Sequence, residues 1–141
     1  MSPPTSAFPR VHRIVFLCVE NSCRSQMAEA FARRHGGPRV DAHSAGSQPS
    51  GQINAGAVEV MRERGFDLSQ QRSKAVAELG EAEFDVAVTM GCGDECPALP
   101  ANRREDWNIP DPKDMPPDEF RQVRDLIEVK VQELLACLNR E

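Results

Sequence analysis

The chain has 141 residues, which suggests a single domain with a sizeable buried core. Apolar residues make up 40% and charged residues 28%, so wholesale disorder and low-complexity polymers are excluded. The chain has 17 Lys and Arg and 22 Asp and Glu, and the resulting net charge of −5 argues against a general nucleic-acid-binding surface. An anionic small substrate is still compatible with this balance, because a local site can be positive within an acidic protein.

The sequence shows no signal for export or membrane insertion. No apolar run approaches the roughly 18 residues of a membrane span, and the run at residues 14–19 is too short for a secretory signal. Five cysteines are an odd number, which does not fit a disulfide scaffold. We therefore expect a cytoplasmic protein whose thiols stay reduced unless chemistry uses them, with no contact to membrane or nucleic acid.

The N-terminal part predicts a tail, a strand and a helix. Residues 1–10 contain three prolines and are expected to form a disordered tail before one domain at 11–141. Residues 12–18 contain the consecutive apolar residues 14–17, which indicates a strand buried on both faces. A helix is expected from about Arg24 to the glycine pair at 36–37.

Weaker elements follow in the middle of the chain. Residues 39–44 predict a second, weak strand. A helix is expected from about Asn54 to Gly65. Ser73 is expected to cap a short helix that runs to Leu79.

The C-terminal part predicts a second buried strand at 84–90 and a long helix whose apolar residues, from 120 to 138, recur every three or four positions. Between them, residues 91–117 hold six of the eleven prolines and predict a long irregular loop. Alternating strands and helices indicate an α/β fold, a single-domain parallel sheet flanked by helices. Ligands of such folds bind beyond the carboxyl ends of strands.

The first strand ends in a turn suited to binding a tetrahedral anion. Its backbone N–H groups and the following helix N-terminus can surround an oxyanion, and Arg24 can bind two of its oxygens. The positive electrostatic potential of these groups also favours the thiolate form of Cys18, which makes this residue a candidate nucleophile. The alternative is that Cys18 is only a small buried residue. The expected binding loop is Cys18, Val19, Glu20, Asn21, Ser22, Cys23, Arg24 and Ser25.

The second strand is followed by another cysteine pair. Cys92 and Cys96 are separated by three residues in a loop with a glycine, so their thiols can approach each other or a third sulfur. Zinc ligation or two unrelated cysteines are the alternatives, although zinc needs closed N/S ligation. Asp111 lies between two prolines that stiffen the backbone. It is therefore a candidate proton donor, the alternative being an exposed loop aspartate.

The segment from Cys18 to Arg24 resembles the signature of the low-molecular-weight tyrosine phosphatase fold. Residues 21–29, Asn-Ser-Cys-Arg-Ser-Gln-Met-Ala-Glu, resemble the thioredoxin-coupled arsenate reductases of that fold. The resemblance covers about residues 12–139. It departs from the phosphatases at Gln26, where they usually have proline, and in the absence of any tyrosine. Further matching segments are Ser44-Ala45-Gly46, Gly65-Phe66-Asp67, Thr89-Met90 and Asp111-Pro112.

The resemblance implies an enzyme of arsenical resistance that reduces arsenate to arsenite. Cys18 is the expected nucleophile, Arg24 the anion ligand and Asp111 the proton donor. Cys92 and Cys96 are expected to carry the redox-active disulfide outward to thioredoxin, with a glutaredoxin or a low-molecular-weight thiol as alternative donors. A low-molecular-weight protein tyrosine phosphatase is the second candidate, and a non-enzymatic anion or metal sensor is the third.

The resemblance also raises the question of a cation. Asn21, Glu29, Ser44 and Asp67 match positions that hold potassium in some family members, and their oxygen atoms suit a hard cation. The alternative is that they hydrogen-bond a loop. No tightly bound cofactor and no transition metal are expected, and a monomer is expected.

Overall fold

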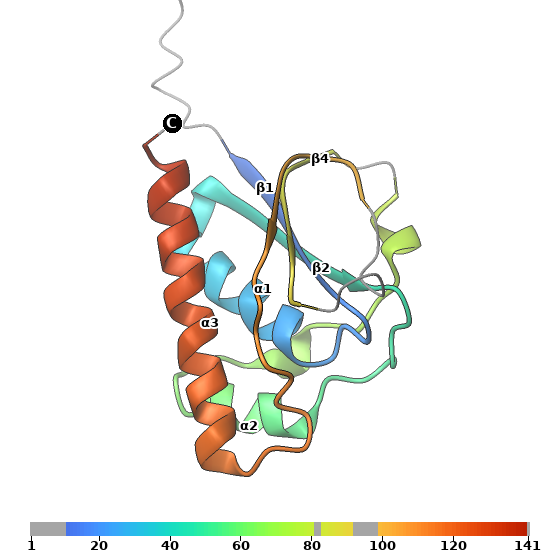
Figure 1. The fold of residues 1–141 in the computed structure, drawn as a ribbon, viewed down its shortest axis with the longest axis vertical. Coiled ribbons are helices and arrows are strands. Elements are labelled where there is room, and N and C mark those ends of the chain that lie inside the picture. Colours follow the sequence, from blue (N-terminus) through green and yellow to red (C-terminus); the bar gives the residue numbers. More distant parts are fainter. Residues whose placement is uncertain (1–10, 81–82, 92–98, 141) are drawn as a thin grey trace, which may run out of the picture.

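The computed structural model describes residues 11–80, 83–91 and 99–140, which contain one parallel sheet of four strands. The strands are β1 His12–Cys18, β2 Val40–Gly46, β3 Phe84–Thr89 and β4 Ala101–Asp106. Their order is β2-β1-β3-β4 (Figure 1). The chain moves to one side of β1 for β2 and to the other side for β3. The carboxyl ends of β1 and β3 therefore flank a topological switch point, where ligands of such sheets bind.

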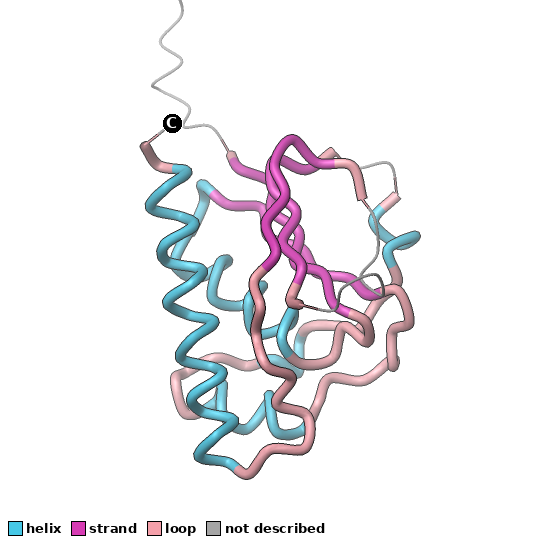
Figure 2. The backbone as a smooth tube through the Cα atoms, in the orientation of Figure 1, coloured by secondary structure: helices cyan, strands magenta, loops and turns pink. Residues whose placement is uncertain are grey.

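The three helices of the described residues are α1 Arg24–Gly36, α2 Ala55–Arg62 and α3 Pro117–Leu138. They lie on one side of the sheet, where α2 packs against α3 beyond the strand ends (Figure 2). The shorter 3-10 turns are η2 Gly37–Arg39, η3 Leu68–Gln70 and η4 Val76–Leu79. No helix in the described ranges has the length and apolar character to cross a membrane.

The apolar run of β1 is buried on both faces, as predicted. Ile14 and Phe16 pack into the main core with residues of α1 and α3. Val15 and Leu17 face a smaller core, which η4 and the start of β4 cover. The predicted α/β fold class is confirmed, and so are the strands at 12–18 and 84–90 and the C-terminal helix. The predicted tail, residues 1–10, lies outside the described residues.

Two details of the predicted organisation are wrong. The predicted loop at 91–117 contains β4, which pairs in parallel with β3. The sequence of β4, Ala-Asn-Arg-Arg-Glu-Asp, carries no apolar run because it is an edge strand, where charged side chains are tolerated. Ser73 does not cap a helix either, because its hydroxyl donates to the carbonyl oxygen of Glu20 and accepts from the amide of Gly51.

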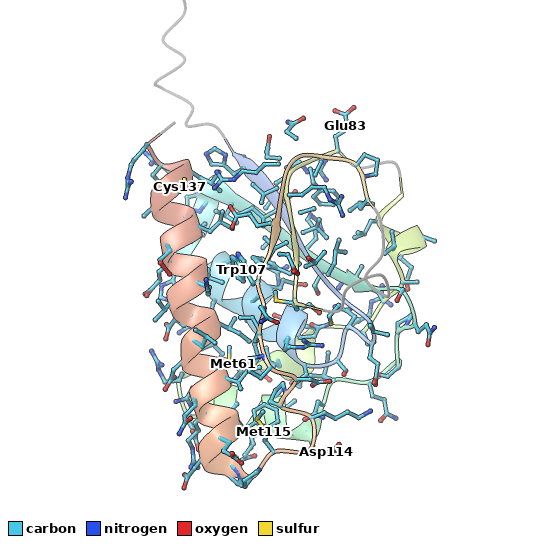
Figure 3. All side chains as sticks on the ribbon, viewed as in Figure 1. Met61, Glu83, Trp107, Asp114, Met115 and Cys137 are labelled. Atoms are coloured by element: carbon cyan, nitrogen blue, oxygen red, sulfur yellow. The ribbon has the colours of Figure 1, made fainter. Side chains whose placement is uncertain are left out.

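The end of β4 fixes the segment that leads to Asp111. The Trp107 amide donates to the Thr89 carbonyl oxygen at 2.7 Å, and the indole packs against Phe16 with ring centroids 5.8 Å apart. Trp107 is labelled in Figure 3, between β4 and α3. Ile109 is also buried. The segment that leads to Asp111 is therefore held against the carboxyl end of β3.

Gly46, the last residue of β2, lets the turn after β1 pass close to the sheet. A Cβ atom at this position would come within 3.0 Å of backbone atoms of Cys18, Val19 and Asn21. Backbone atoms of a loop cannot rotate away as a side chain can. The position therefore requires glycine for the loop to keep its shape.

Gly46→Ala is expected to lower the free energy of unfolding by about 1–3 kcal/mol, as overpacking does, and to weaken phosphate binding. Gly51→Ala is the control, because a Cβ there meets nothing within 4 Å and the variant bears only the strain of its positive φ of 85°. Urea unfolding and calorimetric titration with phosphate measure the two effects. If Gly46→Ala binds phosphate as well as Gly51→Ala does, the contact between Gly46 and the loop after β1 does not determine the shape of that loop.

Candidate active site

A cavity of about 530 Å³ opens at the carboxyl ends of β1 and β3, where the topology places a ligand site. The cavity is lined by the loop after β1, by Gly91, and by the segment that ends at Lys113. Both regions predicted to bind a ligand therefore contribute to one cavity. Its lining residues are Cys18, Val19, Glu20, Ser22, Cys23, Arg24, Gly91, Asn108, Ile109, Pro110, Asp111 and Lys113.

The Cys18 sulfur lies within hydrogen-bond distance of a hydroxyl group. It lies 2.8 Å from the Ser25 hydroxyl oxygen, and the Asn21 side-chain amide donates to that same oxygen, also at 2.8 Å. The Ser25 hydroxyl therefore accepts from Asn21 and still has a hydrogen that it can donate to the sulfur of a Cys18 thiolate.

Asn21 is itself fixed in an uncommon backbone conformation. Its φ of 51° lies in the left-handed region, which Asn adopts more readily than most residues. The Asn21 carbonyl and side-chain oxygens accept from the Gln26 side chain at 2.9 Å. The Lys74 amide donates to the same side-chain oxygen at 2.8 Å. The loop is therefore tied both to its own helix and to a segment about 50 residues away.

Arg24 joins three parts of the cavity wall. Its Nη1 donates to the carbonyl oxygens of Met90 at 2.6 Å and Ile109 at 2.9 Å. Its Nη2 lies 3.9 Å from the Asp111 carboxylate. The guanidinium therefore holds the segments before Gly91 and Asp111 against α1. Among the described residues, its Nε and Nη2 are the donors left for an oxyanion.

Asp111 belongs to the segment after β4 and is held by its own turn. One carboxylate oxygen accepts from the Lys113 amide at 3.1 Å, and the other is the oxygen that faces Arg24. Its side chain is half exposed. The Lys113 ammonium lies 3.1 Å from the Glu20 carboxylate across the cavity.

The remaining cysteines differ sharply in their surroundings. Burial, together with the nearby Asp111 and Cys18, raises the pKa of Cys23 far above the ordinary thiol value, so it stays a thiol. Cys137 lies near the C-terminal end of α3 and contacts Arg103, away from the cavity (Figure 3). Cys92 and Cys96 lie outside the described residues.

The four candidate potassium ligands are engaged by the protein itself. Ser44 donates to Glu29 at 2.5 Å, and the Lys74 ammonium lies 3.6 Å from the same carboxylate oxygen and 3.5 Å from the Ser44 hydroxyl. Asn21 contacts the backbone amide of Lys74. Asp67 instead accepts from Ser69, at the start of η3. The Lys74 ammonium therefore lies close to both Glu29 and Ser44, two of the four candidate ligands.

Sequence reasoning located the anion loop but missed part of its support. Gln26, Lys74 and Lys113 were not among the predicted site residues. The sequence marks Gln26 only as a departure from the phosphatase pattern. The contacts of Lys74 with Ser44 and of Lys113 with Glu20 join residues at least 30 positions apart, so no local pattern could have identified them.

The comparison with known protein families shows which proteins the chain is related to. The sequence profile of the family described as "Low molecular weight phosphotyrosine protein phosphatase" matches residues 13–141. The chain belongs to this family. The predicted relation to its arsenate reductases is confirmed by the following relatives.

An arsenate reductase of Halalkalibacterium halodurans is 41% identical, over 84% of this chain and 91% of its own. A glutaredoxin arsenate reductase of Synechocystis sp. is 34% identical, over 90% of this chain and 98% of its own. A solved structure titled "An arsenate reductase in the phosphate binding state" superposes with a TM-score of 0.80 at 33% identity. The superposition covers 89% of this chain and 98% of that one.

Proposed function

We propose that the protein reduces arsenate to arsenite, with Cys18 as the nucleophile. The observation that carries the proposal is the hydrogen-bonded sulfur of Cys18 in a cavity lined by Arg24 and Asp111, in a chain 41% identical to an arsenate reductase. The reaction takes place in the cytoplasm, where thiols stay reduced, and the protein acts as a monomer.

The first step forms a covalent adduct. Arsenate binds in the loop from Cys18 to Ser25, where backbone N–H groups and Arg24 hold its oxygens. The Cys18 thiolate attacks arsenic, a sulfur–arsenic bond forms, and one oxygen leaves as water. Asp111 supplies the proton that this departing oxygen needs. Arsenic stays pentavalent in this step.

The second step transfers two electrons. A Cys92 thiolate attacks the sulfur of Cys18, a disulfide forms, and the sulfur–arsenic bond breaks with its electron pair on arsenic, which leaves as arsenite. Cys92 is preferred as the attacking thiol because it follows Gly91, which lines the cavity. Cys96 then attacks Cys92 and frees Cys18. The disulfide between Cys92 and Cys96 is reduced by an external thiol protein.

Thioredoxin is the proposed electron donor, and glutaredoxin is the alternative that the name of the Synechocystis relative supports.

Phosphatase activity is the second candidate function. A phosphatase needs only the nucleophile, the arginine and the acid, all of which line the cavity. However, no aromatic side chain occurs among the described lining residues, and the sequence has no tyrosine to frame an aromatic substrate.

The test is arsenite formation from arsenate with thioredoxin, thioredoxin reductase and NADPH, run beside a glutaredoxin and glutathione system. The wild type is expected to turn over repeatedly with the thioredoxin system. Cys18→Ser is expected to form no arsenite, because a hydroxyl is a far poorer nucleophile at neutral pH. Asp111→Asn should slow adduct formation about 10²–10⁴-fold. Efficient hydrolysis of phosphotyrosine without arsenite formation would replace the proposal with the phosphatase.

The relay order predicts an asymmetry between the two loop cysteines. Cys96→Ser should complete one turnover and accumulate a Cys18–Cys92 disulfide, because nothing resolves it. Cys92→Ser should stall before arsenite release. Peptide mapping after a single turnover distinguishes the two variants. A Cys18–Cys96 disulfide that forms in Cys92→Ser at the wild-type rate would reverse the order.

We further propose that Lys74 takes the place of a bound potassium ion. Glu29 is buried, and its carboxylate faces the Lys74 ammonium on one side and the Arg33 guanidinium on the other. A buried carboxylate needs such partners to remain charged. With both present, an added potassium ion has no unpaired charge to neutralise.

The thermal midpoint of the wild type should therefore be equal in KCl and NaCl at matched concentrations. Lys74→Ala should unfold at a lower temperature in NaCl and regain part of the loss in KCl, because Glu29 and Ser44 are then open to a cation. Lys130→Ala, on α3, removes an equal charge elsewhere and should respond to neither salt. Specific stabilisation of the wild type by potassium would contradict this role for Lys74.

A further inference from the structure

The mouth of the cavity carries two charges of opposite sign that the proposed chemistry does not use. Glu20 belongs to the anion loop, and Lys113 lies two residues beyond Asp111. Their charged groups meet at 3.1 Å, with 40% of the Glu20 side chain and 50% of the Lys113 side chain exposed. Both residues line the same cavity as Cys18 and Arg24.

Glu20 is fixed where a negative charge is unfavourable for an anion site. Its carbonyl oxygen accepts from the Ser50 amide at 3.1 Å and from the Ser73 hydroxyl at 2.8 Å. These contacts hold the backbone of the loop at Glu20, whose side chain lines the cavity and is 40% exposed. A carboxylate at the mouth of a cavity lowers the local concentration of an approaching anion.

Lys113 is held opposite this carboxylate. Its backbone amide donates to Asp111, which fixes the start of its side chain on the far wall of the cavity. The hydrogen bond to Glu20 is the main cause that raises the pKa of the Lys113 ammonium. The group therefore stays charged over the range in which a thiolate enzyme works.

We propose that Lys113 determines the affinity of the cavity for small tetrahedral oxyanions by neutralising Glu20, without contacting the anion itself. Among the described residues that line the cavity, the four charged side chains then form two pairs, Arg24 with Asp111 and Lys113 with Glu20. Arrival of an anion at Arg24 leaves the second pair intact. The identity of the anion as arsenate rests on the proposed function, whereas the charge compensation does not.

The experiment is calorimetric titration of the reduced, full-length protein with inorganic phosphate at low ionic strength. Lys113→Ala should weaken binding about three- to tenfold, the range expected for one exposed charge. Glu20→Gln should tighten binding, and the double variant Glu20→Gln with Lys113→Ala should return close to the wild type. Raising the salt concentration should shrink all these differences, because the charges are screened.

Lys130→Ala is the matched control, since it removes the same charge from α3 and should leave phosphate binding as it is. A double variant as weak as Lys113→Ala would overturn the proposal, because it would mean that the ammonium binds the anion directly. Equal weakening by Glu20→Gln and Lys113→Ala would also overturn it, because the pair would then act by tying the loop to the segment of Asp111. Unchanged binding in Lys113→Ala would overturn it as well.

Arsenate kinetics provide a second readout. Lys113→Ala should raise KM for arsenate by a similar factor with kcat retained, because the chemical step does not involve the ammonium. A fall in kcat at unchanged KM would overturn the proposal. If the protein reduces no arsenate but the phosphate pattern holds, the charge compensation is supported and only the proposed function fails.

Discussion

The hydrogen-bonded series from Asn21 through Ser25 to Cys18 is the interaction on which the cavity depends. It places the Ser25 hydroxyl beside the sulfur, and Asn21, which donates to that hydroxyl, has a left-handed backbone conformation. Such a conformation is unfavourable for most residues and persists where the surroundings over-determine it. Here Gln26 and the backbone of Lys74 provide that restraint. The nucleophile is therefore positioned by contacts that originate outside its own loop.

The same architecture explains how an acidic protein can offer an anion site. The chain carries a net charge of −5, yet two carboxylates close to Arg24 in the sequence, Glu20 and Glu29, are each matched with a lysine. Lys74 neutralises the buried Glu29 behind the loop, and Lys113 faces Glu20 at the cavity mouth. Local pairing lets Arg24 act on an incoming anion without competition from these carboxylates. Net charge alone could not have indicated this arrangement.

The sequence predicted best the elements whose apolar residues form a clear pattern along the chain. The apolar run of β1 and the stripe of α3 identify a buried strand and a one-sided helix, and both lie where expected. β4 was missed because an edge strand of charged residues has no such signal. The sequence predicts a helix cap at Ser73, but the Ser73 hydroxyl contacts Glu20 and Gly51 instead. Only the tertiary structure brings these two residues to Ser73.

The candidate site follows the same rule. Cys18 and Arg24 could be predicted because one strand–turn–helix unit contains both and sets their geometry. Lys74 and Lys113 could not, because their partners are brought to them by the packing of distant segments. Asp111 is an intermediate case. Its flanking prolines indicate a stiff turn, but its approach to Arg24 depends on the buried Trp107 and Ile109.

The central claim is that protein thiols supply both electrons for arsenate reduction, beginning at Cys18. The most direct measurement is a single turnover of fully reduced protein with excess arsenate and no external reductant, in which arsenite and remaining thiols are counted together. The account predicts one arsenite and the loss of two thiols for each protein molecule, and neither change in Cys18→Ser. Arsenite formation without thiol loss, or equal arsenite formation in Cys18→Ser, would contradict it.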